Sequence, residues 1–76
     1  MEIKVLGTGC VGCKALLRNV QEAVAQLGLN AQVTKEEDLM KIMEYNVMSL
    51  PALVVDGTVV SKGQRLSVEQ VKKLLQ

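Results

Sequence analysis

Histidine, tryptophan and phenylalanine are absent from this 76-residue sequence, and tyrosine occurs once. The lack of histidine excludes histidine-based general base catalysis and histidine metal ligands. The shortage of aromatic residues excludes the stacking platforms that bind single-stranded nucleic acid. The sequence has nine Lys and Arg residues and eight Asp and Glu residues, so it lacks the large excess of positive charge that binds phosphates. We therefore expect no nucleic-acid partner.

Long apolar runs are also missing. No stretch approaches the roughly 20 apolar residues of a membrane span, and Glu2 and Lys4 interrupt the apolar residues at the start of the chain, where a signal peptide would be apolar. We expect a cytoplasmic protein without a membrane partner. The length predicts a single domain over residues 1–76, and we expect a monomer.

The apolar pattern that remains predicts an α/β protein with the element order βαβαββα. Alternating or continuous apolar residues predict strands over 1–6, 29–34, 52–55 and 58–60. Spacings of three and four residues predict helices over 13–27, about 39–45 and 68–75. Gly28 ends the first helix, Asp56-Gly57 forms a hairpin turn, and Ser67 caps the last helix. Helices between the early strands predict parallel pairing, so the four-stranded sheet is mixed and flanked by helices.

Core positions follow from the same pattern. The last helix is expected to bury Val68, Val71, Leu74 and Leu75. Met40, Met43 and Met48 are expected to fill gaps in a core that has no Phe or Trp, although with Tyr45 they would also suit a partner surface. The acidic run 36–38 is expected to be the solvated start of the second helix.

Two cysteines, Cys10 and Cys13, are the unusual chemical feature of the chain. A structural disulfide between them would close so short a loop that the entropy model gives only about 2 kcal/mol. A Cys-x-x-Cys turn between a strand and a helix is instead typical of a redox site. The positive end of the helix favours the thiolate. Position therefore predicts Cys10 as the nucleophile and Cys13, one turn inward, as the resolving thiol.

Two other uses of these cysteines stay open. Gly7-Thr8-Gly9-Cys10-Val11-Gly12-Cys13 also resembles the loop of small soft-metal chaperones, in which Cys10 and Cys13 would bind copper or zinc. Members of that family have the element order βαββαβ, whereas this sequence predicts a helix as its last element. A redox sensor that binds another protein according to the state of the Cys10–Cys13 pair is a third hypothesis.

The stretch from Tyr45 to Gly57, with the sole proline Pro51 before an apolar strand, resembles the thioredoxin fold. By itself Pro51 would be an ordinary trans proline at the first residue of a strand. The resemblance implies instead a cis proline that faces the cysteines, with the backbone of Leu50 pairing with an extended substrate segment. The motifs cover nearly all 76 residues and are most similar to small thioredoxin-like or glutaredoxin-like redox-active disulfide proteins.

This resemblance implies a thiol–disulfide oxidoreductase acting on protein disulfides. Its catalytic residues would be Cys10 and Cys13, and its substrate-binding residues Leu50 and Pro51. The partners would be a disulfide-containing protein substrate and a reductase that the sequence does not identify. No cofactor is expected beyond the redox-active Cys10–Cys13 disulfide, and no metal unless the carrier hypothesis holds.

Overall fold

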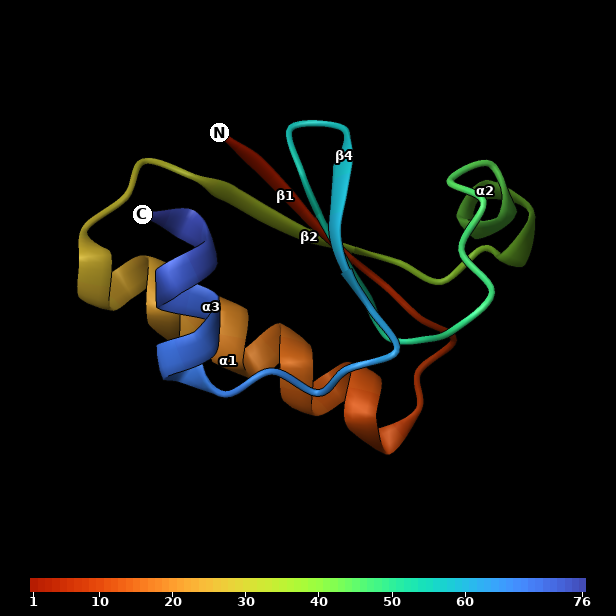
Figure 1. Cartoon of the computed structure of the whole chain (residues 1–76), viewed down its shortest axis with the longest axis horizontal. Helices are drawn as coiled ribbons and strands as arrows, with labels where there is room; N and C mark the ends of the chain where they lie inside the picture. The colour runs from red at the N-terminus through yellow and green to blue at the C-terminus, as the bar shows by residue number, and fades with distance from the viewer.

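The computed structural model describes all residues from 1 to 76 and contains four strands and three helices. In chain order these are β1 (Glu2–Leu6), α1 (Val11–Leu27), β2 (Gln32–Glu36), α2 (Leu39–Met43), β3 (Ala52–Val55), β4 (Thr58–Lys62) and α3 (Val68–Leu75). The predicted order βαβαββα is confirmed (Figure 1). None of the helices has the length and apolar character that a bilayer span needs.

The strands form one mixed sheet in the order β2-β1-β3-β4. The strand β1 pairs in parallel with β2 and antiparallel with β3, and β3 pairs antiparallel with β4. The helix α1 provides the crossover that the parallel pair requires. Because β1 is held on both sides, the loop that leaves its carboxyl end and leads to Cys10 starts from a firmly positioned strand.

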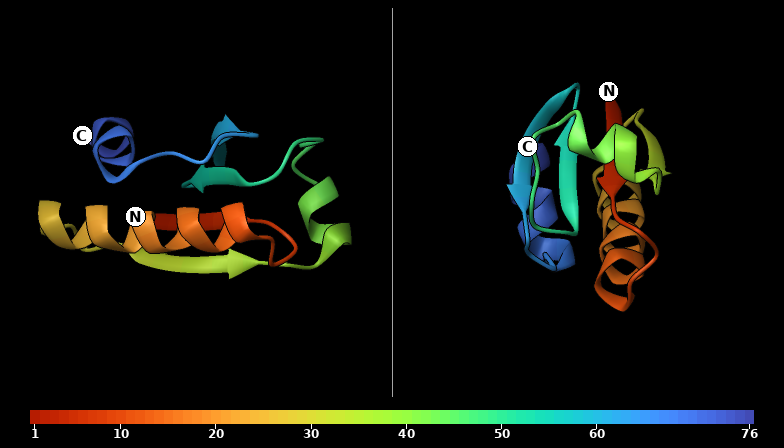
Figure 2. Two further views of the ribbon diagram at one scale, coloured as in Figure 1. Left: turned by 90° about the horizontal axis from the view of Figure 1, so that it is seen from below. Right: turned by 90° about the vertical axis from the view of Figure 1, so that its right-hand side faces the viewer.

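The two faces of the sheet build two separate cores. On one face α1 and α3 pack over Ile3, Val5 and Leu53 in a core of nine buried residues. The helices lie against each other (Figure 2), and the Asn19 side-chain amide donates a hydrogen bond of 2.9 Å to the carbonyl of Leu66. The opposite face has a smaller core formed by Leu6, Ile42, Val47, Ala52 and Val54. The larger core therefore anchors α1, whose first turn carries the cysteines.

Helix α1 begins at Val11, two residues before the predicted start at Cys13. The reason is a cap that Cys10 supplies: its backbone is extended, and its sulfur accepts a hydrogen bond from the backbone N–H of Cys13. Cysteine is not among the usual N-cap residues, so the spacing of apolar residues did not place the helix start there. The predicted end is confirmed, because Gly28 adopts the left-handed conformation with φ 64°.

The second strand differs from its prediction. The pattern predicted residues 29–34, whereas β2 covers Gln32–Glu36. Its register with β1 explains the shift, because Glu2 pairs with Gln32 and Leu6 pairs with Glu36, and residues before Gln32 have no partner in β1. The apolar alternation was nevertheless informative, since Leu29, Ala31 and Val33 all pack against the larger core. The alternation of apolar residues therefore indicated which side chains are buried, whereas pairing with β1 sets the bounds of β2.

The methionine prediction is wrong. Met40, Met43 and Met48 are 75%, 60% and 97% exposed. Helix α2 is only five residues long and ends at Met43 rather than near Tyr45; Ile42 is the residue that it buries. The smaller core is complete without the methionines. Of the acidic run, Glu36 belongs to β2, and the Asp38 carboxylate caps α2 by accepting a hydrogen bond from the N–H of Met40.

The C-terminal elements follow the prediction closely. Asp56 and Gly57 both have positive φ, 48° and 83°, as a two-residue hairpin turn requires. The strand β4 continues to Lys62, past the predicted end at residue 60. Ser67 caps α3 in a reciprocal capping box with Gln70. In the predicted stripe, Val71 and Leu75 are buried and Val68 packs against the core, but Leu74 is 42% exposed and stays outside the core.

Candidate active site

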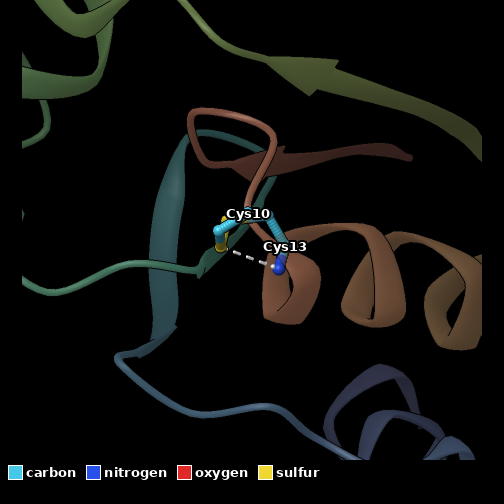
Figure 3. The surroundings of a disulfide bond; sticks show 2 residues. All are labelled: Cys10 and Cys13. Carbon is cyan, nitrogen blue, oxygen red and sulfur yellow. Dashed lines mark hydrogen bonds between the residues drawn. A yellow bond between two sulfur atoms is a disulfide. The ribbon is translucent and has the colours of Figure 1, made fainter.

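The site lies where the chain leaves β1 and enters α1 (Figure 3). Cys10 and Cys13 form a disulfide, with their Cα atoms 5.0 Å apart. Cys10 is exposed, whereas Cys13 is only 5% exposed. The sulfur of Cys10 accepts a hydrogen bond from the backbone N–H of Cys13, with 3.0 Å between nitrogen and sulfur. A thiolate at this position would therefore receive a hydrogen bond from the first turn of the helix. No acidic residue in that turn opposes this effect.

Gly7 lies in close contact with Cys13 of the disulfide. It is buried at the end of β1, and its N–H donates a hydrogen bond of 3.0 Å to the carbonyl of Glu36. A methyl group on Gly7 would lie 2.8 Å from Cys13 Cβ and closer still to the sulfur of Cys13. The structure shows that the absent side chain of Gly7 is what allows Cys13 to pack against β1.

The segment before β3 passes beside the disulfide (Figure 3), and the Leu50–Pro51 peptide bond is cis. A methyl group on Gly12 would lie 3.8 Å from Pro51 Cδ, which places the proline ring against the Cys-x-x-Cys turn. The N–H of Gly63 holds the segment from the other side by donating a hydrogen bond of 2.8 Å to the Pro51 carbonyl. The N–H and carbonyl of Leu50 make no hydrogen bond within the protein. Four predicted site residues, Cys10, Cys13, Leu50 and Pro51, therefore come together.

Gly63 is expected to be the more sensitive of two glycines with similar backbone angles. Gly63 and Gly57 have φ values of 71° and 83°, so alanine costs about 1–2 kcal/mol in strain at either position. At Gly63 the new methyl group would also lie 2.9 Å from Ser49 Cβ, whereas at Gly57 it meets nothing within 4 Å. We expect Gly63→Ala to lose about 1–3 kcal/mol more than Gly57→Ala in urea unfolding. Equal losses would show that Ser49 and the proline segment do not depend on Gly63.

Charged groups surround the disulfide unevenly. The guanidinium of Arg65 packs on Gly12, since a methyl group there would lie 3.5 Å from Nε and 3.7 Å from Nη2. Lys14 is exposed in the first turn of α1. A carboxylate oxygen of Glu37 would lie 3.1 Å from a methyl group on Gly9. Sequence patterns missed Arg65, because no motif marks a basic residue in the β4–α3 loop as a neighbour of the cysteines.

The soft-metal alternative is not favoured by this arrangement. The chain does not have the βαββαβ order of that family. Cys10 and Cys13 also lack a third cysteine or carboxylate, because no group of three or more such residues gathers anywhere in the structure. Structural zinc takes four ligands in most proteins. Two sulfurs without further ligands suit thiol–disulfide exchange better than a closed zinc site.

Comparison with known proteins agrees with this geometry. A family model described as a thioredoxin domain matches residues 1–76. The chain is 40% identical over 75 residues to a thioredoxin of Methanothermobacter thermautotrophicus, covering 99% of this chain and 97% of the relative. It is 37% identical over 73 residues to a thioredoxin of Methanocaldococcus jannaschii, covering 96% and 84% of the two chains. With its fold, its Cys-x-x-Cys turn and its proline segment, the chain belongs to the thioredoxin family.

Proposed function

We propose that this thiol–disulfide oxidoreductase reduces disulfide bonds of other proteins with Cys10 as the nucleophile and Cys13 as the resolving thiol. The observation that carries the proposal is the asymmetry of the pair. Cys10 is exposed at the N-terminus of α1, whereas Cys13 is buried behind it. A protein disulfide reaches only the outer sulfur. The inner sulfur is shielded from solvent and stands ready for the second step.

The reaction begins with both cysteines reduced. The Cys10 thiolate attacks one sulfur of the substrate disulfide, forms a mixed disulfide and releases the other substrate sulfur as a thiolate. The Cys13 thiol then loses its proton, and its thiolate attacks the Cys10 sulfur. The second substrate thiolate leaves, and the Cys10–Cys13 disulfide forms. Two electrons pass to the substrate, whose two thiolates take up protons, and no other redox group takes part.

Helix α1 assists the first step. Its free backbone N–H groups and its dipole stabilise negative charge at Cys10. The hydrogen bond of 3.0 Å between the N–H of Cys13 and the Cys10 sulfur has the direction that this stabilisation needs. Lys14, exposed in the same turn, adds positive potential.

Leu50 and Pro51 are proposed to align the substrate. The unpaired N–H and carbonyl of Leu50 would form strand-like hydrogen bonds with an extended segment around the substrate cysteine. Pro51 has no N–H to leave unsatisfied beside the disulfide. Its position against Gly12 brings such a segment next to Cys10. Alignment of this kind accelerates the attack, because it removes the orientational freedom of the two sulfurs before they react.

The proposal requires two partners. One is a protein with an accessible disulfide, and the other is a reductase that returns Cys10 and Cys13 to the dithiol state. The exchange passes through sulfur atoms alone, so the proposed cycle needs no cofactor or metal. We propose that the protein works as a monomer in the cytoplasm, where reducing conditions maintain thiols.

The proposal is tested with the reduced wild-type protein and a protein disulfide substrate, with dithiothreitol as the electron donor. We expect turnover well above the dithiothreitol background. The pH dependence of Cys10 alkylation should give a pKa below the free-thiol value of about 8.5, so reactivity falls only as the pH drops through that lower pKa. Absence of turnover, together with a Cys10 pKa at or above about 8.5 and tight retention of zinc or copper against a chelator, would contradict the proposal and support a metal carrier.

A further inference from the structure

Arg65 occupies a defined position beside the disulfide. It lies in the loop between β4 and α3, 52 residues after Cys13 in the sequence. Its Nε and Nη2 atoms and Pro51 Cδ all lie within 3.8 Å of the point where a methyl group on Gly12 would stand. The guanidinium, the proline ring and the Cys-x-x-Cys turn therefore meet at one place. An extended segment that pairs with Leu50 must pass close to the guanidinium.

The guanidinium of Arg65 has no partner in the protein. The ion pairs of the molecule join Lys35 to Glu37, Lys41 to Glu36 and Lys72 to Glu69. No side-chain hydrogen bond involves Arg65 either, and its side chain is exposed. Its planar array of donors fits a carboxylate in a bidentate manner. Arg65 is thus an unpaired cation on the proposed substrate side of the site.

The other charges near the turn do not neutralise Arg65. Lys14 is itself cationic, and the N-terminus of α1 has the same sign. Glu37 lies near Gly9, and its carboxylate is paired with Lys35 at 3.5 Å. The face formed by Gly12, Pro51 and Arg65 therefore presents positive charge without an internal counterion.

We infer that Arg65 is a specificity-determining residue, which binds a carboxylate of the substrate and so favours disulfides flanked by Asp or Glu. The inference rests on the proposed function, because it assumes that the substrate segment lies along Leu50 and Pro51. The pair forms in a partly exposed position, where such ion pairs contribute modestly. Acidic substrates should consequently be preferred by a factor of about two to five in kcat/KM.

The test uses three peptide disulfides that differ only in one residue next to the cysteine, which is Glu, Gln or Lys. With dithiothreitol as donor, the wild type should prefer the Glu peptide to the Gln peptide about two- to fivefold and disfavour the Lys peptide. Arg65→Gln should abolish the preference, Arg65→Lys should keep part of it, and Arg65→Glu should reverse it. Raising the salt concentration should shrink the wild-type preference, because screening weakens the ion pair.

Arg18→Gln is the matched control. Arg18 is an exposed guanidinium further along α1, so its loss changes the net charge equally and should preserve the preference. A preference that persists in Arg65→Gln would overturn the inference. So would an equal loss of rate with all three peptides and a raised Cys10 pKa, since Arg65 would then act on the thiolate. No turnover of any peptide by the wild type would overturn the proposed function itself, and the role of Arg65 with it.

Discussion

Cys10→Ser is expected to lower the disulfide-reducing turnover to the background of the dithiol donor, a loss of at least about a thousandfold. The serine hydroxyl keeps the shape of the turn but is hardly ionised at neutral pH, and it cannot form a mixed disulfide. Cys13, which is 5% exposed, cannot replace it for a large substrate. The measurement is turnover with a protein disulfide substrate at a fixed dithiothreitol concentration.

Cys13→Ser should behave differently, because it blocks only the second step. The Cys10 thiolate can still attack, but no internal thiol resolves the product. We expect a covalent adduct of protein and substrate to accumulate, visible by mass spectrometry as the sum of the two masses. Added dithiothreitol should release it.

Thr8→Ser is the control for both cysteine variants. It places a serine in the same exposed loop and leaves both thiols intact, so turnover should be unchanged. Adduct formation by Cys10→Ser and not by Cys13→Ser would assign the two roles in the opposite way. Full turnover by either single variant would contradict a dithiol mechanism altogether.

Gly7→Ala is expected to disturb both the fold and the redox site, although it leaves both cysteines in place. The added methyl group would lie 2.8 Å from Cys13 Cβ and nearer to its sulfur. Both atoms belong to Cys13, in the first turn of α1, and the sulfur is also part of the disulfide. They can move away from the new methyl group only if α1 shifts relative to β1. Overpacking of this kind costs about 1–3 kcal/mol. For a domain of this size, the midpoint temperature of thermal unfolding should fall by at least about 4–8 °C.

The same variant should shift the redox equilibrium. In the oxidised protein the disulfide holds the Cys13 sulfur against Gly7, whereas the reduced thiol can rotate to another χ1 rotamer. The alanine therefore destabilises the oxidised form more than the reduced form. Each kcal/mol of this difference raises the reduction potential by roughly 20 mV. Equilibration with a glutathione couple measures the change.

Gly12→Ala is the matched stability control for Gly7→Ala, because Gly12 lies between the two cysteines and Gly7 lies three residues before Cys10. At Gly12 the new methyl group makes only ordinary contacts, the nearest at 3.5 Å, and alanine is the better helix former. We expect Gly12→Ala to be neutral or to stabilise by up to about 1 kcal/mol. Equal stability of Gly7→Ala and the wild type would mean that α1 adjusts freely over β1.

Local patterns predicted most of the fold because their causes are local. Gly28 and Ser67 stop and start helices through their own backbone and side-chain groups, and Asp56-Gly57 turns the hairpin by itself. The prediction was least accurate where a distant segment sets the outcome. The bounds of β2 depend on the length of β1, with which it pairs. The start of α1 depends on a cysteine sulfur acting as the cap.

The exposed methionines show that the spacing of apolar residues does not predict how many of them are buried. Apolar spacing around residues 39–43 predicts a buried helix face, and Ile42 does occupy one. How many further side chains are buried depends on the space that Leu6, Ala52 and Val54 leave on that face of the sheet. The sequence pattern contains no measure of that space. Met40 and Met43 therefore stay in solvent, as a partner surface would require.

The reactive groups of the protein are evident from its sequence: two thiols at a helix start, a proline before an apolar strand, and no histidine or aromatic platform for other chemistry. The surroundings of those thiols became visible once the chain was folded. The fold places Gly7 beneath Cys13, and it brings Arg65 onto Gly12 from a loop 53 positions away. This difference arises because a thiol and a helix end act through neighbouring atoms in the chain, whereas steric fit and charge act between segments that only folding brings together.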